Sequence, residues 1–331
     1  MKKASPTIAS PAWVLILVAA VSAALAVLLD PLPVVQAEDT VVRLTYSMAP
    51  NAFTTVAKER GELAKELAAK GIKVEWVGPF PNHAPTIQAV VGETADFSFG
   101  GTTTVGFAAI LAGSPLVFTQ YYDYSPRTSA ILAIDPAIKT VKDLVGKSVA
   151  NNRSGIGETL LTAALEANGL DRSQVEYVYM NPPEGAMALA SGAVDAWVMW
   201  SPEVDLARET NKAHDVFSER DLPYPLDYSG WVARREYVEK NPEIVKAVNE
   251  AFRHVGEWIS THPEEHEKLL KSVWKYDDSL TPYFISIANK YTFHDPSDKE
   301  FLDRFQASVD WLTKNKVLPG SIDVRAVLLQ P

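Results

Sequence analysis

Short apolar runs alternate with amphipathic stretches through most of the chain. Val41–Tyr46 and Ile72–Val77 have the pattern of strands, and Phe53–Ala69 between them has the spacing of an amphipathic helix that ends at Gly71. This strand–helix–strand opening predicts a mainly parallel sheet covered by helices. The C-terminal part predicts helices at Asn241–Ser260, between Thr261 and Trp274, at Pro282–Lys290 and at Asp298–Asn315.

One central segment carries the alternation most clearly. A strand at Lys147–Ala150 runs into the polar turn Asn151–Gly155, which opens an amphipathic helix. Strands are predicted at Val175–Tyr179 and up to Trp200, with a helix through Ala186–Ala190 between them. A helix start presents unpaired N–H groups and a positive dipole end, which suits an anion. We therefore expect a ligand at the edge where strand ends and helix starts gather.

Two pairs of residues repeat at the same spacing. Ala89 and Asp96 are separated by the same interval as Ala188 and Asp195, and each pair bridges the end of a helix and the start of a strand. The polar or aromatic clusters that end those strands are Gly100–Thr103 and Trp200–Pro202. The repeat predicts two similar α/β units.

The first 37 residues have the organisation of a secretory signal. Two lysines give a positive start, Trp13–Leu29 is an apolar run, and Val35–Ala37 offers small residues at the spacing that a signal peptidase reads. We expect cleavage after Ala37. The alternative is an uncleaved membrane anchor, and both interpretations export the rest of the chain.

Three motifs and one tripeptide carry a family resemblance. The motifs are Lys142–Lys147, Ala167–Leu170 and Gly192–Trp197, and Trp200-Ser201-Pro202 is the tripeptide. With these the chain resembles the periplasmic solute-binding proteins of ABC importers, in the nitrate, taurine and aliphatic-sulfonate group, which often has Trp-Asp-Pro at the tripeptide. The resemblance implies an α/β, two-lobed periplasmic-binding-protein-like fold (type II), each lobe a mixed, mainly parallel sheet flanked by helices. It also implies a periplasmic monomer that delivers a small molecule to a permease and an ATPase.

The same resemblance divides the chain after the signal. Residues 38–128 are expected to form the first part of lobe one, residues 129–228 lobe two, and residues 229–331 the return to lobe one with the C-terminal helices. Leu116–Tyr122 and Ser129–Ile134 are predicted strands that carry the chain between lobes, and Tyr228–Ala233 is the predicted return crossing. Crossings of this kind act as hinges, so closure around a ligand is the expected motion.

Composition narrows the function further. The net charge of −10 and the pI of about 5.2 argue against a nucleic-acid partner. The absence of cysteine excludes disulfides, thiolate metal sites and a cysteine nucleophile. No cofactor is implied.

The candidate ligand-binding residues belong to the strand ends and helix starts. They are Ser47, Asn51, Gly101, Thr102, Thr103, Ser154, Gly155, Ile156, Gly157, Glu158, Trp200 and Trp231. Glycines permit close backbone approach and hydroxyls donate hydrogen bonds, whereas the two tryptophans are candidate aromatic walls, with core packing as the alternative for each. Gly157 and Glu158 depart from the family pattern, which often has His and Tyr at this point. A carboxylate there repels an anion unless it points away; it acts either as a first-turn acid favoured by the helix dipole or as a partner of a ligand amine or hydroxyl.

The expected ligand is an aliphatic sulfonate or taurine, with nitrate, a sulfate ester, an aromatic carboxylate or a pyrimidine as alternatives. We predict a binding protein rather than an enzyme. An enzyme on the same fold, such as a pyrimidine-precursor synthase or a hydrolase, would need an acid–base pair, for which His83 and Glu158 are the only candidates. His262–His266 matches an H-x-x-E-H metalloprotease string, but its proline and acids are ordinary helix-start signals.

Overall fold

The computed structural model describes Met1 and residues 40–47, 52–223, 225, 227–287 and 290–329. The predicted signal segment therefore lies outside the described residues, apart from Met1, and so does Asn51. Within the described part of the chain, no helix is both long and apolar enough to span a bilayer.

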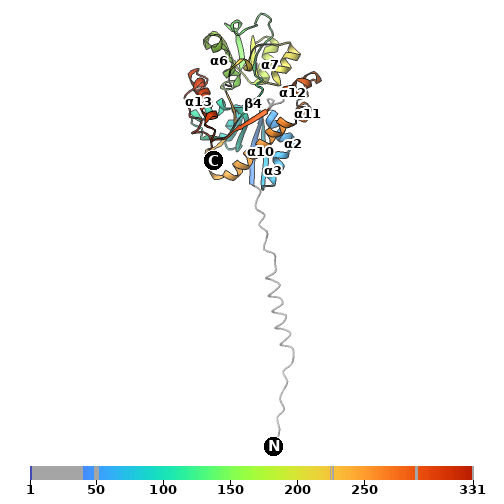
Figure 1. Ribbon diagram of the computed structural model, residues 1–331, viewed down its shortest axis with the longest axis vertical. Coiled ribbons are helices and arrows are strands. Elements are labelled where there is room, and N and C mark those ends of the chain that lie inside the picture. Colours follow the sequence, from blue (N-terminus) through green and yellow to red (C-terminus); the bar gives the residue numbers. More distant parts are fainter. Residues whose placement is uncertain (2–39, 48–51, 224, 226, 288–289, 330–331) are drawn as a thin grey trace. The chain divides into compact units, whose positions relative to one another are not determined.

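Two sheets organise residues 40–329 (Figure 1). The six-stranded sheet has the order β11-β4-β10-β3-β1-β2 and the five-stranded sheet the order β7-β6-β8-β5-β9. The strands of the larger sheet are β1 Thr40–Ser47, β2 Ile72–Phe80, β3 Phe97–Thr102, β4 Leu116–Ser125, β10 Ser229–Arg234 and β11 Lys290–His294. The strands of the smaller sheet are β5 Ala130–Ala133, β6 Ser148–Asn151, β7 Glu176–Tyr179, β8 Ala196–Met199 and β9 His214–Ser218.

Helices flank both sheets, with α6 and α7 beside the smaller one and α2, α3 and α10 beside the larger (Figure 1). Their bounds are α2 Ala52–Arg60, α3 Glu62–Ala68, α4 His83–Val91, α5 Thr103–Leu111, α6 Ile156–Ala167, α7 Pro182–Ser191, α8 Glu203–Asn211, α9 Arg235–Lys240, α10 Pro242–Thr261, α11 Pro263–Trp274, α12 Thr281–Ile287 and α13 Lys299–Lys314. This arrangement confirms the α/β fold class expected from the sequence.

Strand direction positions the candidate site. In the larger sheet β1 pairs in parallel with β2 and β3, and in the smaller sheet β6 pairs in parallel with β7 and β8. The carboxyl ends of each parallel trio therefore share one edge of their sheet. The chain passes from the larger to the smaller sheet between Ser125 and Ala130 and re-enters the larger sheet at Ser229.

An aromatic core stabilises the larger sheet. The Trp231 ring is fully buried, and its centroid lies 5.1 Å from those of both Tyr122 and Phe252 and 5.7 Å from that of Phe53. Its indole nitrogen donates a 2.6 Å hydrogen bond to the side-chain oxygen of Asn249, so its polar atom is satisfied inside the core.

Three local predictions differ from the structure. The helix predicted at Phe53–Ala69 is two helices, α2 and α3, because Gly61 between them has a φ of 73° that interrupts helical geometry. The end of the helix predicted at Pro282–Lys290 is wrong, because Lys290 begins β11, which pairs with β4. Helix α8 and strand β9 were not predicted, because α8 is short and mostly polar.

The repeat seen in the sequence has a structural counterpart. The backbone N–H of Asp96 donates to the Arg43 carbonyl in β1, and that of Asp195 donates to the Ser148 carbonyl in β6. Each carboxylate in turn accepts the backbone N–H of the same strand residue at 2.8 Å. Asp96 thus fastens the start of β3 to β1, and Asp195 fastens the start of β8 to β6, by the same pair of hydrogen bonds.

Candidate functional site

The carboxyl-terminal strand edge of the larger sheet is built around α4 and the start of α5. His83, the first residue of α4, lies directly against Gly101, since a Cβ on that glycine would come within 2.1 Å of the imidazole. The imidazole Nε2 is 3.0 Å from the Ser98 hydroxyl. Burial lowers the pKa of His83 to about 4, so the ring is neutral at pH 7. Only glycine fits at position 101 beside this ring.

The start of α5 holds a carboxylate of the protein itself. The Thr103 hydroxyl donates a 2.7 Å hydrogen bond to Asp227, which also accepts the backbone N–H of Tyr228 at 2.8 Å. Burial raises the pKa of Asp227 to about 7, although the Thr103 hydrogen bond and the charge of Arg127 act in the opposite direction. Thr103 is fully buried, and its hydroxyl holds the start of α5 to Asp227 inside the protein.

In the smaller sheet, Glu158 occupies the start of α6. Its carboxylate accepts the backbone N–H of Ser154 at 2.6 Å and the Tyr179 hydroxyl at 2.7 Å, and it forms an ion pair with Arg172. Only 4% of its side chain is exposed. The charge that the sequence placed at the anion position is thus neutralised by a partner inside the protein.

Asn152 reinforces the same helix start. Its side-chain oxygen accepts the backbone N–H of Gly157 at 3.0 Å. A Cβ on Gly155 would come within 1.7 Å of the Asn152 amide nitrogen, and one on Gly157 within 2.5 Å of its oxygen. Both glycines therefore let this amide fold over the helix start.

A hydrogen bond between side chains joins the two edges. The Asn82 amide nitrogen, just before α4, donates at 2.6 Å to the side-chain oxygen of Asn181, just before α7. On one side Asn82 is followed by His83, which lies against Gly101. On the other side Asn181 follows Met180, whose N–H donates to the carbonyl of Asn151 at the end of β6. A chain of contacts therefore runs from the α5 start to the strand end that leads into α6.

The remaining sequence candidates lie in different settings. Trp200 follows β8, is half-buried and packs against the core of the smaller sheet. Trp231 is inside the aromatic core of the larger sheet with none of its surface exposed, so it is not a wall of an open site in this structure. Ser47 ends β1 beside Phe80 of β2, and its side chain is outside the described part, as is all of Asn51.

Several polar atoms along these edges are buried without a hydrogen-bond partner among the described residues. They include the hydroxyls of Thr102 and Thr159 and the side-chain oxygen of Asn151. Buried polar groups are normally paired, so an unpaired set at strand ends and helix starts is typical of a site that a ligand or water completes.

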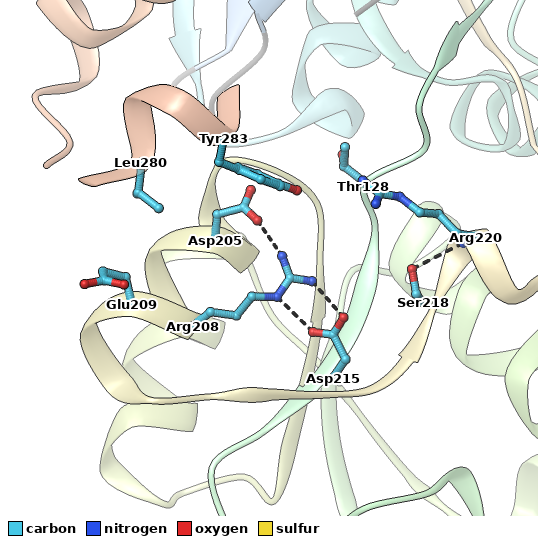
Figure 2. Close-up of a pocket in the computed structure, with 9 residues that line it drawn as sticks. All are labelled: Thr128, Asp205, Arg208, Glu209, Asp215, Ser218, Arg220, Leu280 and Tyr283. Carbon is cyan, nitrogen blue, oxygen red and sulfur yellow. Dashed lines mark hydrogen bonds and ion pairs between the residues drawn. The ribbon is translucent and has the colours of Figure 1, made fainter. Parts of the chain in front are cut away.

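A separate pocket of about 410 Å³ lies between the smaller sheet and α12 (Figure 2). It is lined by Thr128, Asp205, Arg208, Glu209, Asp215, Ser218, Arg220, Leu280 and Tyr283. Figure 2 shows the Arg208 guanidinium between two acids, and it is bound to Asp205 and, at 2.8 and 3.1 Å, to Asp215. With its central cation already bound twice, this pocket is poorly suited to an anion, and no described candidate residue from the sequence lines it.

The H-x-x-E-H string lies away from these edges, in the α10–α11 turn. The His262 ring stacks on Trp258, with centroids 5.2 Å apart, and His266 is buried. In the described ranges, no three His, Cys, Asp or Glu side chains gather in a metal-binding arrangement.

Sequence reasoning missed Asn82, Asn152, Arg172, Tyr179 and Asn181 as parts of this region. Asn82 and Asn181 had a usable signal, because each precedes a helix that begins with proline nearby. Arg172 had none, because its partner lies 14 residues earlier across a helix and only the fold brings them together.

The family model described as NMT1/THI5 like matches residues 52–266, which is more than half of the chain. The chain belongs to the NMT1/THI5-like family. The taurine-binding periplasmic protein of Escherichia coli K12 is 27% identical over 215 residues, 64% of each chain. The formylaminopyrimidine-binding protein of Halalkalibacterium halodurans is 27% identical over 226 residues, 66% of each chain.

Solved structures agree with this family. The periplasmic aliphatic sulphonate binding protein SsuA from Escherichia coli has 25% identity and a TM-score of 0.73, covering 88% of this chain and 92% of that one. The alkanesulfonate-binding protein SsuA from Xanthomonas axonopodis pv. citri, bound to MOPS, has 21% identity and a TM-score of 0.80, covering 89% and 100%. The resemblance to the taurine and sulfonate group is thereby confirmed for family and fold.

Proposed function

We propose that this chain is the exported solute-binding component of an ABC importer, which captures a small organic anion between its two sheets and delivers it to a permease with an ATPase. In this proposal the two sheets are the cores of two lobes, bounded as residues 38–128 with 229–331 and residues 129–228. The protein acts as a periplasmic monomer after removal of residues 1–37.

The observation that carries the proposal is the chain of contacts from Gly101 through His83, Asn82 and Asn181 to the end of β6. It joins the candidate residues of both sheets at the edge where ligands bind in α/β folds. The relatives named for taurine and aliphatic sulfonates support a sulfonate as the ligand.

Charge at the α6 start is compatible with an anionic ligand. The Glu158 carboxylate is paired with Arg172, so together they add no net charge where the ligand's anionic group is expected. The backbone N–H of Ile156, the Ser154 hydroxyl and the Trp200 ring are the proposed ligand contacts, joined by Gly101 and Thr102 from the larger sheet. The N–H groups of Ser154, Gly155 and Gly157 are already bound within the protein. We leave Trp231 out because it is fully buried.

A pyrimidine is the second candidate ligand. It is supported by the relative named for formylaminopyrimidine. A flat, neutral ring would depend on Trp200 more than on the helix starts, because stacking needs no charge.

A binding screen tests the proposal. The purified exported chain is heated with taurine, ethanesulfonate, nitrate, a sulfate ester, benzoate and an aminopyrimidine, and the ligand that raises the melting temperature is then titrated by calorimetry. We expect a sulfonate to bind at one site without being consumed. Conversion of a bound compound to product, or binding of none of these compounds, would contradict the proposal.

Variants at the paired acid sharpen the anion assignment. Arg172→Met leaves Glu158 buried and uncompensated, so we expect sulfonate affinity to fall at least about tenfold. Adding Glu158→Gln to that variant removes the charge and is expected to restore most of the affinity. Unchanged affinity in Arg172→Met and in Ser154→Ala would mean that the ligand binds elsewhere.

A further inference from the structure

Asn82 and Asn181 occupy equivalent positions in the two halves. They are 99 residues apart, and the same offset relates Ala89 to Ala188 and Asp96 to Asp195. It also relates the start of α4 to the start of α7 and the start of β3 to the start of β8. The repeat found in the sequence thus extends from before the helix to the following strand.

Backbone hydrogen bonds follow the same offset. The N–H groups of Thr94 and Ala95 both donate to the Ala89 carbonyl, and those of Ala193 and Val194 both donate to the Ala188 carbonyl. The residue in the positive-φ position of each turn is Glu93 at 61° and Gly192 at 72°. The two units therefore share their turn geometry as well as their element order.

The Asn82–Asn181 hydrogen bond joins equivalent positions of the two units. The equivalent helices α4 and α7 therefore meet at their starts at this contact.

We propose that Asn82 and Asn181 are the closing pair of the binding site, meeting when the two sheets approach and slowing release of a bound organic anion. This rests on the proposed function for the identity of the ligand. Because both asparagine side chains are short, rotation of one half away from the other breaks their hydrogen bond.

A different contact between the two sheets provides the control. The Trp311 indole of α13 donates to Glu166 of α6, and Lys314 lies 3.6 Å from the same carboxylate. This contact also joins the halves, but its residues are not related by the 99-residue offset. It tests whether any hydrogen bond between the halves slows release or only the one between equivalent residues.

Release kinetics test the proposal directly. Stopped-flow fluorescence measures dissociation of ethanesulfonate from the wild type, Asn82→Ala, Asn181→Ala, the double variant and Trp311→Phe. We expect each asparagine variant to release the probe roughly three- to tenfold faster, the typical effect of one neutral hydrogen bond, and the double variant to be no faster than the singles. Trp311→Phe should stay within about twofold. Additive asparagine effects, no effect, or equal acceleration in Trp311→Phe would overturn the assignment.

Crosslinking tests the contact without depending on the ligand. The chain has no cysteine, so Asn82→Cys with Asn181→Cys introduces the only thiols. A short bismaleimide is expected to join this pair, and not the pair Asn82→Cys with Met187→Cys, whose second site is exposed further along α7. Failure of the first pair to join overturns the closing contact. Joining it while no sulfonate binds to the wild type would refute the proposed function and leave the contact standing.

Discussion

Two parts of the described chain, β2–α4–β3 and β7–α7–β8, repeat one unit of a strand, a helix and a second strand, with different side chains at its tip. At the tip of the first unit are Gly101 and Thr102, and at the equivalent positions of the second are Trp200 and Ser201. The two tips therefore differ mainly at the first position, where glycine in one unit corresponds to tryptophan in the other, whereas both have a hydroxyl at the second position. The comparison suggests that the repeated parts position the edges and that the unrepeated parts select the ligand.

The shared aspartates also differ in their surroundings. The Asp96 side chain is 3% exposed and binds the Arg43 guanidinium at 2.7 Å, whereas that of Asp195 is 35% exposed and binds the Ser148 hydroxyl at 2.9 Å and Lys147 at 3.4 Å. The same pair of backbone hydrogen bonds thus involves a buried carboxylate in the larger sheet and a partly exposed one in the smaller. Burial, rather than the hydrogen-bond pattern, should decide how much each contributes.

The largest expected effect is on the free energy of unfolding at this pair. Asp96→Ala leaves the Arg43 backbone N–H without its acceptor and the guanidinium, which is 34% exposed, without its carboxylate partner, so we expect a loss of about 3 kcal/mol. Asp195→Ala should lose only about 1–2 kcal/mol, because water replaces part of the carboxylate. Urea denaturation of both variants measures the difference. Equal losses would mean that the two fastenings are energetically alike.

His83 should give the first half a source of acid sensitivity that the equivalent position of the second half lacks. His83 is equivalent to Pro182, and its pKa, lowered by burial to about 4, lies below the usual 6.5. Between these pH values the unfolded chain binds a proton that the folded chain does not, so stability is present above pH 6.5 and falls by up to about 3 kcal/mol as the pH drops to 4. Denaturation of His83→Gln at several pH values should show a flatter decline than the wild type. A parallel decline in both proteins would exclude His83 as its source.

The two tryptophans should separate ligand binding from stability. Trp200→Ala is expected to weaken sulfonate binding about tenfold by removing the aromatic tip of the second unit. Trp231→Phe should leave affinity within about twofold and lower stability by about 1–2 kcal/mol, since it loses the bond to Asn249 and some core volume. Calorimetry and thermal melts on both variants check this. A larger loss of affinity in Trp231→Phe would return that residue to the site.

The smallest effect concerns the turn that both units share. Gly192→Ala is expected to cost about 1 kcal/mol, because alanine is strained at a φ of 72°. Glu93→Gly should change stability by less than about 0.5 kcal/mol, because relief at a φ of 61° is offset by the freedom that glycine gains when unfolded. Thermal melts with both variants measure this. A loss above 1 kcal/mol in Glu93→Gly would show that its side chain has a role of its own.

The order of elements could be predicted because strands and helices carry their own periodicity. The Lys147–Ala150 strand, the helix that follows it and the Asp96–Asp195 repeat all follow from local spacing. Strand β11 was missed because its residues pair with β4, far away in the sequence, and nothing local distinguishes Lys290 from the end of a helix.

The candidate site was less accessible to sequence reasoning. Glycines 155 and 157 were chosen as ligand contacts, and the structure gives them a second reason, since both admit the Asn152 amide. The environment of Glu158 depends on Arg172 and Tyr179, which reach it only through the packing of the smaller sheet. Burial of Trp231 likewise follows from aromatic neighbours that come from distant segments of the chain.

The position of β10 between β3 and β4 governs the order in which the chain can assemble. The smaller sheet is one continuous segment and can form as soon as residues up to Ser218 are available. Strands β3 and β4 have no shared hydrogen bonds until Ser229–Arg234 arrives to bridge them. A nascent chain stopped before that strand would therefore have a complete smaller sheet and an incomplete larger one. Its unpaired strand edges would be exposed to proteases and chaperones until the last third of the chain is synthesised.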